Sequence, residues 1–341
     1  MNLSVGIATV TLHPAIDQSV LIRGFASGSL NRVLSEQCDP GGKGVNVASF
    51  LADLRLRVTA TGLLGRENAG VFEQLFVERG ITDAFVRIPG KTRVNIKILD
   101  ETAAEVTEIN FPGPAASADC LAALTRAIDA LLPDHDCFIL SGSVPAGVPA
   151  AFCPDLIRRL KVAGKRVLLD SSGDALRHGI AAGPWAIKPN LAELEELVGE
   201  PLRDELAVIR AARALLAAGL DCVVVSMGQE GALFVTAEEC LQATPAEVPV
   251  HSTVGAGDAL VAGFVAGSLR GWSLADCARL ATASALGALT QAVRRLPPTP
   301  AIESLMAQVS VRPVVEPAGH RLLSVRSETK RRCVPPRVGE E

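Results

Sequence analysis

The sequence lacks tyrosine altogether, and aromatic residues make up only 4% of its 341 residues. So few aromatic side chains argue against a surface on which nucleic-acid bases stack. No apolar run is long enough to cross a bilayer, and the first residues lack the basic end and the cleavage site of a signal peptide. We therefore expect a cytoplasmic protein with neither nucleic acid nor a membrane as its partner.

The eight cysteines include no Cys-x-x-Cys pair, and the five histidines are scattered along the chain. This pattern argues against a zinc site and is typical of reduced thiols. The formal net charge of -4 gives no general electrostatic reason to bind a polyanion, so an enzyme acting on small molecules is favoured. Positive charge gathers at the end of the chain, where residues 317–341 hold six Lys or Arg against three Glu. We expect a basic, disordered tail over 316–341.

The rest of the chain alternates strand-like with helix-like patterns. Strands are expected at 3–12, 58–64, 137–141, 166–170, 185–188 and 221–226, and helices at 44–54, 68–79, 149–163, 191–198 and 205–218. Such alternation predicts an α/β fold in which helices cover both faces of a mostly parallel sheet. Residues 16–38 and 92–110 instead carry alternating, β-branched patterns without a helix. There we expect a small antiparallel sheet that projects from the main one as a lid.

The stretch 253–259, Thr-Val-Gly-Ala-Gly-Asp-Ala, follows a strand-like pattern at 248–251 and leads into a long apolar helix. Gly255 and Gly257 permit turn dihedrals through which amides converge at the helix N-terminus, where the helix dipole favours an anion such as phosphate. Asp258 would stand beside that anion as the acceptor of a hydroxyl proton. The same residues also suit an ordinary tight turn before a helix, so other segments must decide between the two interpretations.

Several other motifs suit a phosphorylated sugar. Residues 39–48, Asp-Pro-Gly-Gly-Lys-Gly-Val-Asn-Val-Ala, open a helix and offer amides and a positive charge to such a ligand. Asp17 could accept two sugar hydroxyls, although it is equally an ordinary turn aspartate. Arg93 and Lys97 leave the same face of one lid strand, and with Lys43 they would form a cationic cluster for a substrate phosphate. The alternative for these cations is a solvated strand face.

Two further motifs suit a bound ligand, the first of them a metal near phosphates. Asn190 and Glu193 lie one turn apart at a helix start, where a carboxylate near phosphates would suit Mg²⁺ held mostly through waters. The same pair is also typical of a capping box, and both interpretations can hold together. Ser141 directly follows an apolar strand, which is where α/β sheets place ligands.

The motifs occur in the order of one known family. Gly41-Gly-Lys-Gly-Val-Asn46, Lys188-Pro-Asn-Leu-Ala-Glu193, Ser226-Met-Gly-Gln-Glu-Gly231 and Thr253-Val-Gly-Ala-Gly-Asp258 resemble the signatures of the ribokinase-like (PfkB) carbohydrate kinases. Thr11-Leu-His-Pro-Ala-Ile-Asp17, Thr92-Arg-Val-Asn-Ile-Lys97 and Asn110-Phe-Pro-Gly-Pro114 are similar to its 1-phosphofructokinase and tagatose-6-phosphate kinase branch. The resemblance spans roughly residues 1–315, which we expect to form one kinase domain with lid strands within about 12–40 and 88–113.

The resemblance implies an ATP-dependent kinase of ribokinase-like three-layer α/β/α fold, with Mg²⁺ as its metal, that acts on a ketohexose phosphate. It implies that Asp258 is the general base and that the amides of Gly255, Ala256 and Gly257 form the anion hole. The implied substrate-binding residues are Asp17, Gly42, Lys43, Asn46, Arg93, Lys97 and Ser141. The implied ATP-site residues are Lys188, Asn190, Ser226, Gly228 and Gly231, with Glu193 placing the metal.

Fructose 1-phosphate, giving fructose 1,6-bisphosphate, is the main expectation for the acceptor. Tagatose 6-phosphate and fructose 6-phosphate stay open, because a cationic cluster does not say which carbon bears the phosphate. A nucleoside kinase is disfavoured by Arg93 together with Lys43. A non-catalytic sugar-phosphate sensor is the alternative from another class, although it should have lost the base or the anion hole that is present here.

Two expectations concern the neighbourhood of the sugar. His13 stands where the branch usually carries asparagine, and because Asp17 is kept we expect His13 to lie behind the substrate-binding residues. Pairing two lids across a twofold axis would hide their strand edges, so we expect a homodimer through the lid.

Overall fold

The computed structural model describes residues 6–103 and 105–314, and the expected tail at 316–341 lies outside them. Most strands form one sheet in the order β15-β14-β13-β12-β11-β10-β9-β1-β4-β5, with β6 paired to β4. Its members are β1 (Gly6–Thr11), β4 (Val58–Gly65), β5 (Thr82–Asp83), β6 (Val86–Ile88), β9 (His135–Ser141), β10 (Arg166–Asp170), β11 (Ala186–Ile187), β12 (Cys222–Ser226), β13 (Ala232–Val235), β14 (Cys240–Thr244) and β15 (Ser310–Pro313). Pairing is parallel from β5 to β12 and antiparallel from β12 to β15, which confirms a mostly parallel sheet.

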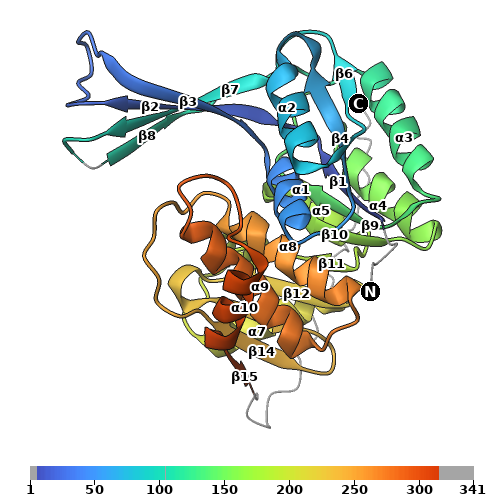
Figure 1. The fold of residues 1–341 in the computed structure, drawn as a ribbon. Helices are drawn as coiled ribbons and strands as arrows, with labels where there is room; N and C mark the ends of the chain where they lie inside the picture. Colours follow the sequence, from blue (N-terminus) through green and yellow to red (C-terminus); the bar gives the residue numbers. More distant parts are fainter. Residues whose placement is uncertain (1–5, 104, 315–341) are drawn as a thin grey trace, which may run out of the picture.

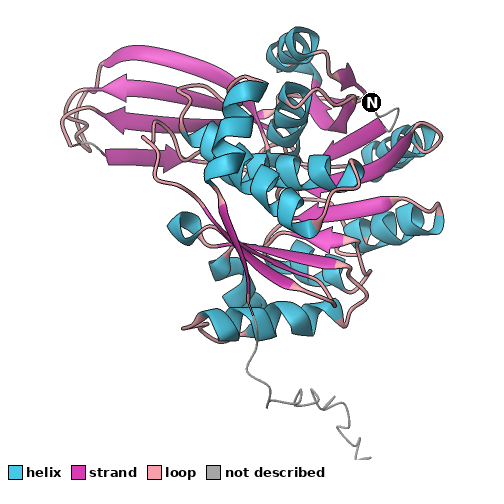
Figure 2. Ribbon diagram, turned by 60° about the horizontal axis from the view of Figure 1, so that its bottom comes forward, coloured by secondary structure: helices cyan, strands magenta, loops and turns pink. Residues whose placement is uncertain are grey.

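Helices cover both faces of this sheet (Figure 2), which confirms the three-layer arrangement. One layer holds α1 (Lys43–Asp53), α2 (Gly70–Arg79), α8 (Ala256–Leu269), α9 (Leu274–Leu289) and α10 (Thr299–Gln308). The other holds α3 (Ala118–Leu131), α4 (Phe152–Val162), α5 (Gly173–Ile180), α6 (Leu191–Val198) and α7 (Glu205–Leu216). Two short 3-10 turns, η1 (Arg66–Asn68) and η2 (Gly228–Glu230), complete the described helical structure.

The strands supply side chains to two separate cores because successive residues point to opposite faces. In β10, Leu168 packs in the core under the α1 and α8 layer, whereas Val167 and Leu169 pack in the core under α4. Burying one such side chain contributes about 1.5–3 kcal/mol to the free energy of folding. Since both faces are covered, these strands form nearly continuous apolar runs in the sequence.

A second, four-stranded sheet projects from the body (Figure 1). It contains β2 (Ala15–Ile22), β3 (Val33–Gly41), β7 (Arg93–Asp100) and β8 (Glu105–Ile109), in the order β3-β2-β7-β8. The predicted small second sheet, for which we keep the name lid, is therefore confirmed, but the prediction that it is antiparallel is wrong for its central pair, because β2 and β7 run parallel. The two strands follow β1 and β6, which lie in the parallel part of the body, so both hairpins leave it in the same direction.

The prediction of a strand at 248–251 is also wrong, since no strand lies between β14 and α8. Pro245 and Pro249 lack the N–H that a sheet ladder needs, so the segment runs as a loop. His251 instead donates its amide to the Leu289 carbonyl of α9, 2.8 Å away. Among residues 6–103 and 105–314, no helix has the length and apolar character needed to cross a membrane.

Candidate active site

Polar residues gather at the carboxyl ends of the parallel strands. Ser141 ends β9 and Asp170 ends β10, and the two residues are paired across these strands. Lys188 directly follows β11, the next strand along. This edge of a parallel sheet is where α/β proteins bind ligands, and the N-terminal ends of α1 and α8 supply further polar groups.

Glycines shape the start of both helices. Gly255 caps α8 with a φ of 85°, and Gly42 caps α1 with a φ of 111°; both values lie in the region that favours glycine. No side chain caps α8, so the amides of Ala256 and its neighbours are open to an anion. A Cβ at Gly257 would lie 3.7 Å from the Lys188 Nζ, which shows that an ammonium group stands beside this turn.

Asp258 is buried in the first turn of α8. Its Oδ2 accepts a hydrogen bond of 2.8 Å from the Asn46 Nδ2 of α1. Burial and the nearby charge of Asp170 raise the pKa of Asp258 to about 6, against the opposing effects of Asn46, Lys43 and Lys188. A carboxyl group with this pKa is ionised near pH 7 and is still basic enough to take a proton from a hydroxyl.

The sequence analysis missed Asp170, whose side chain is fully buried. Its Oδ1 lies 3.1 Å from the Lys43 Nζ and 3.4 Å from the Lys188 Nζ, while its Oδ2 has no partner. Burial lowers the pKa of Lys43, but the surrounding carboxylates, Asp170 first, outweigh it and raise the pKa. Lys43, which the sequence grouped with Arg93, therefore pairs with Asp170. The position of Asp170 at the end of a predicted strand was the signal that could have revealed it.

We call Lys43, Asn46, Asp170, Lys188 and Asp258 the deep cluster. They come from α1, β10, the end of β11 and α8, and Asn46 and Asp258 are separated by 212 positions in the sequence. The cluster combines two carboxylates, one of which can act as a base, with two ammonium groups, and it lies beside the open amides of α8. Such a set can hold phosphate oxygens and accept a hydroxyl proton at one place.

A second polar group, which we call the lid-base cluster, consists of Asp17, Asn95, Lys97 and Arg294. The Asp17 Oδ1 accepts from the Asn95 Nδ2 at 3.2 Å, and its Oδ2 pairs with the Arg294 guanidinium and lies 4.0 Å from the Lys97 Nζ. Sequence reasoning predicted Asp17 and Lys97 but missed the other two. Asn95 lies between Arg93 and Lys97 on one strand face, so the same two-residue period could have found it. Nothing in the sequence pointed to Arg294.

Arg93 enters the site at the start of β7. Its guanidinium donates to the carbonyls of Pro14, Phe111 and His13 at 3.3–3.4 Å, which fixes its direction. Burial lowers the pKa of Arg93, and the charge of Asp17 opposes this effect. Because its described partners are uncharged carbonyls, this guanidinium can still pair with an anion.

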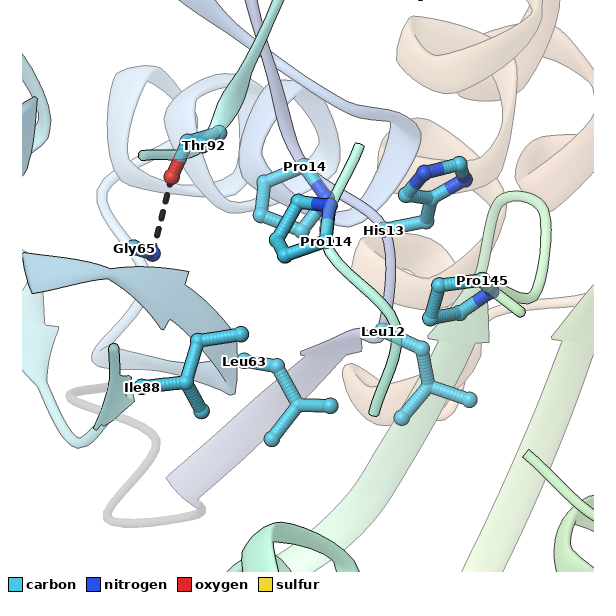
Figure 3. Close-up of a pocket in the computed structure, with 9 residues that line it drawn as sticks. All are labelled: Leu12, His13, Pro14, Leu63, Gly65, Ile88, Thr92, Pro114 and Pro145. Atoms are coloured by element: carbon cyan, nitrogen blue, oxygen red, sulfur yellow. Dashed lines mark hydrogen bonds between the residues drawn. The ribbon is translucent and has the colours of Figure 1, made fainter. Parts of the chain in front are cut away.

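His13 lines a small pocket at the base of the lid, together with Leu12, Pro14, Leu63, Gly65, Ile88, Thr92, Pro114 and Pro145 (Figure 3). Its Nε2 donates to the Pro112 carbonyl at 2.9 Å, so its Nδ1, 3.0 Å from the Ser143 Oγ, accepts. Burial and then the charge of Arg93 lower the pKa of His13, which keeps the ring neutral near pH 7. The pocket lining is mostly apolar, so it offers few partners for sugar hydroxyls.

The residues expected to line the ATP site lie at or just beyond the ends of the neighbouring strands β11 and β12. Asn190 caps α6 and forms the predicted capping box with Glu193, through two hydrogen bonds of 2.8 Å. Asn190 also forms an isolated bridge with Ser226 at the end of β12. Beyond β12, Gly228 begins η2 and Gly231 follows its last residue, with φ of 61° and 87° respectively. The end of β11 and the end of β12 thus form one edge of the site.

The metal position can be judged from the available carboxylates. Within the described parts of the chain, no group of three or more His, Cys, Asp or Glu side chains could hold a metal ion by itself. One oxygen of Glu193 takes part in the capping box, whereas the buried Asp170 Oδ2 has no partner. Mg²⁺ needs only one or two carboxylates when phosphates and waters complete its shell. These residues therefore fit a cation shared with a nucleotide.

The three-layer fold, the lid and the open N-terminus of α8 beside a buried carboxylate define a small-molecule kinase of the ribokinase-like class. The family described as pfkB family carbohydrate kinase matches residues 1–299. The chain therefore belongs to this family, which confirms the resemblance drawn from its motifs.

Relatives with assigned names support the same branch. The chain is 46% identical to a 1-phosphofructokinase of Rhodobacter capsulatus over 307 residues, which covers 90% of this chain and 97% of the relative. It is 40% identical to a 1-phosphofructokinase of Escherichia coli K12 over 308 residues, covering 90% and 98%. Among solved structures, phosphofructokinase-2 from Escherichia coli in complex with substrates and products matches with a TM-score of 0.82 and 30% identity, covering 89% of this chain and 99% of the other.

Proposed function

We propose that this protein is a 1-phosphofructokinase, which transfers the γ-phosphoryl group of ATP to fructose 1-phosphate and gives fructose 1,6-bisphosphate. The observation that carries the proposal is the deep cluster, in which a buried carboxylate with a raised pKa stands beside an open helix N-terminus. Identities of 40–46% with relatives named 1-phosphofructokinase, over about nine-tenths of the chain, support the choice of acceptor.

Asp258 accepts the proton of the acceptor hydroxyl in this mechanism. The hydroxyl oxygen forms a bond to the γ-phosphorus while the bond from that phosphorus to the β,γ-bridging oxygen breaks, and ADP leaves. The amides of Gly255, Ala256 and Gly257 stabilise the charge on the transferred group, and Lys188 lies beside them. Asn46 holds the Asp258 carboxylate towards α1, where the sugar would be bound.

Asp17, Gly42 and Asn46 bind sugar hydroxyls in this proposal, and Ser141 contributes at the end of β9. Arg93, Lys97 and Lys43 supply positive charge for the phosphate that the sugar already carries. Support comes from Arg93, whose described partners are neutral carbonyls. Lys97 lies 4.0 Å from Asp17 and 3.8 Å from Glu108, beyond hydrogen-bonding distance of both carboxylates, so its ammonium group can turn to a phosphate. Lys43 would serve the phosphate only by leaving its partner Asp170, so we assign it the weaker contact.

Lys188, Asn190, Ser226, Gly228 and Gly231 line the ATP site in this proposal. Glu193, together with Asp170, would hold Mg²⁺ largely through waters and phosphate oxygens. When bound, Mg²⁺ neutralises charge on the phosphates. The protein residues meanwhile orient the γ-phosphoryl group towards the N-terminus of α8.

Phosphorylation of a 6-phosphate sugar is the second candidate. Solved relatives include phosphofructokinase-2 from Escherichia coli in complex with fructose-6-phosphate, with a TM-score of 0.81 and 29% identity. Tagatose 6-phosphate belongs to the same group of acceptors. A non-catalytic sugar-phosphate sensor is disfavoured because the base and both turn glycines are in place.

We further propose that residues 1–315 form one kinase domain, that the enzyme works in the cytoplasm, where ATP is available, and that it forms a homodimer through its lid. The edge strands β3 and β8 carry exposed apolar side chains, among them Val33, Leu34, Val106 and Ile109. A second lid would bury this apolar surface and pair the open strand edges. The solved relatives include a tetrameric inhibited form of phosphofructokinase-2 from Escherichia coli.

A coupled assay of ADP release tests the proposed reaction. Fructose 1-phosphate, fructose 6-phosphate, tagatose 6-phosphate and unphosphorylated fructose are compared side by side with Mg-ATP. We expect the highest kcat/KM with fructose 1-phosphate and fructose 1,6-bisphosphate as the product. A clear preference for a 6-phosphate sugar would transfer the assignment to the second candidate, and binding of sugar phosphates without any turnover would establish the sensor.

A further inference from the structure

The loop between α9 and α10 reaches the base of the lid through Arg294. The Arg294 Nη2 pairs with the Asp17 carboxylate of β2, and its Nη1 lies 3.5 Å from the Pro40 carbonyl oxygen of β3. The pair joins positions 277 residues apart, and both side chains are mostly shielded from solvent. One side chain from the helical layer therefore holds two neighbouring lid strands.

The backbone of this loop is itself fixed. The Arg294 carbonyl accepts from the Arg79 Nη2 of α2 at 3.2 Å. Two residues further on, the Leu296 amide donates to the Asp53 Oδ2 at 2.9 Å, and Arg79 also pairs with the Asp53 Oδ1 at 2.8 Å. Arg294 thus extends from a braced segment, so its guanidinium is preorganised and loses little freedom when it pairs.

The contacts leave Asp17 with room for a ligand. Arg294 and Lys97 approach Oδ2, while Asn95 donates to Oδ1. An ionised carboxylate has about four acceptor positions on its two oxygens, and the Lys97 Nζ, at 4.0 Å, is too far from Oδ2 to donate a hydrogen bond, so each oxygen keeps a position for a sugar hydroxyl. Because Arg294 binds Oδ2 and Asn95 binds Oδ1, the plane of the carboxylate is fixed, and with it the directions of the remaining acceptor positions.

A glycine beside the pair provides independent support. A Cβ added at Gly41 would lie 2.8 Å from the Asp17 Oδ2 and 2.9 Å from the Arg294 Nη1. Both distances are shorter than real Cβ contacts, so a larger residue at this position would have to displace the Asp17 carboxylate and the Arg294 guanidinium. The end of β3 is therefore shaped around the contact between Asp17 and Arg294.

We propose that Arg294 is a substrate-positioning residue, which orients Asp17 for the sugar hydroxyls and holds the base of the lid on the body. The inference rests on the proposed role of Asp17 as a sugar ligand. Loss of the guanidinium leaves the Asp17 carboxylate free to rotate towards Lys97, and it removes one contact that holds β2 and β3 on the body. Sugar binding then weakens, while the deep cluster and the ATP site keep their contacts.

Steady-state kinetics of Arg294→Gln test this role. We expect the KM for fructose 1-phosphate to rise about tenfold or more, because a hydrogen-bonded charge pair is lost, while the KM for ATP stays within about twofold. Arg294→Lys should recover part of the loss, and Gly41→Ala should weaken sugar binding in the same direction. The matched control is Arg295→Gln in the same loop, whose side chain is 53% exposed and lies 4.0 Å from Asp53, and it should behave as the wild type.

A double variant separates positioning from general stability. In an Asp17→Asn background, Arg294→Gln should add little to the KM for the sugar, since the partner is already changed. An unchanged KM in Arg294→Gln, a full additional effect in the Asp17→Asn background, or an equal loss in Arg295→Gln would each overturn the proposal. If fructose 1-phosphate is not the acceptor, the same comparison is made with whichever sugar phosphate the wild type turns over.

Hydrogen exchange of the protein without substrates gives a readout that does not depend on the reaction. Arg294→Gln should increase amide exchange in residues 15–22 and 33–41 several-fold, with no change in the strands of the body. Unaltered exchange in the lid would refute the holding role even if the wild type had no kinase activity. The failure of the proposed reaction and the failure of this inference are therefore distinguishable.

Discussion

The deep cluster and the lid-base cluster differ in how the fold builds them. The deep cluster is formed by strand ends and helix starts of the main layers, all packed in the two cores. The lid-base cluster joins two strands of a projecting sheet to one loop of the helical layer. We infer that the first performs the chemistry in a rigid frame, and that the second adjusts the position of the sugar. Changes in the first should therefore lower kcat, and changes in the second should raise the KM for the sugar.

The largest expected effect belongs to the deep cluster. Asp258→Asn removes the proton acceptor but keeps a group of similar shape beside Asn46, so kcat should fall about 10²–10⁴-fold with the KM for ATP nearly unchanged. Steady-state kinetics give both values. Asp276→Asn is the matched control, because Asp276 also stands in the first helical turn of a neighbouring helix, at the exposed start of α9. Retention of kcat in Asp258→Asn would remove this carboxylate from the mechanism.

A smaller effect, on binding, is expected at the start of β7. Arg93→Gln should raise the KM for fructose 1-phosphate about 10–100-fold, because a charge-assisted contact to its phosphate is lost. The KM for unphosphorylated fructose, where it can be measured, should change little. Lys91→Gln, an exposed cation two residues earlier, serves as the control. An equal loss with both sugars would show that Arg93 shapes the site without contacting the phosphate.

The smallest effect concerns the ATP edge. Asn190→Ala removes the cap of α6 and should cost about 1 kcal/mol in the free energy of unfolding, measured by chemical denaturation. Asp204→Ala removes the equivalent cap of α7, away from the site, and should cost a similar amount. If Asn190 also contacts the nucleotide, only its variant raises the KM for ATP. Equal KM values for ATP in the two variants would show that Asn190 acts only as the cap of α6.

The two clusters were not equally predictable from sequence. Asp258, Asn46 and Lys188 each follow a strand or begin a helix in a motif, and a parallel sheet brings such positions to one edge. Their neighbourhood could therefore be anticipated before any coordinates. Arg294 lies in a loop without periodic pattern, and its contact with Asp17 depends on how the lid bends towards the helical layer. Local sequence patterns carry no information on how close Arg294 comes to Asp17.

The errors in the fold have similar causes. The parallel pairing of β2 with β7 depends on the directions in which two distant hairpins leave the body, whereas each hairpin alone is antiparallel as expected. The prediction of a strand at 248–251 was wrong because it relied on the alternation of apolar residues. Pro245 and Pro249 have no N–H group to donate to a neighbouring strand. Long, doubly covered strands were the most reliable features, since both of their faces must be apolar.

The pH dependence of kcat/KM tests the central claim most directly, namely that a buried Asp258 in the deep cluster is the base. Because burial and Asp170 raise the pKa of Asp258 to about 6 in the protein without substrates, kcat/KM should fall below that pH as the carboxylate takes up a proton. Asp170→Asn removes the neighbouring negative charge, so the fall should move to lower pH in that variant. A profile that stays flat from about pH 8 down to about pH 5, or one that Asp170→Asn shifts upward, would contradict the account.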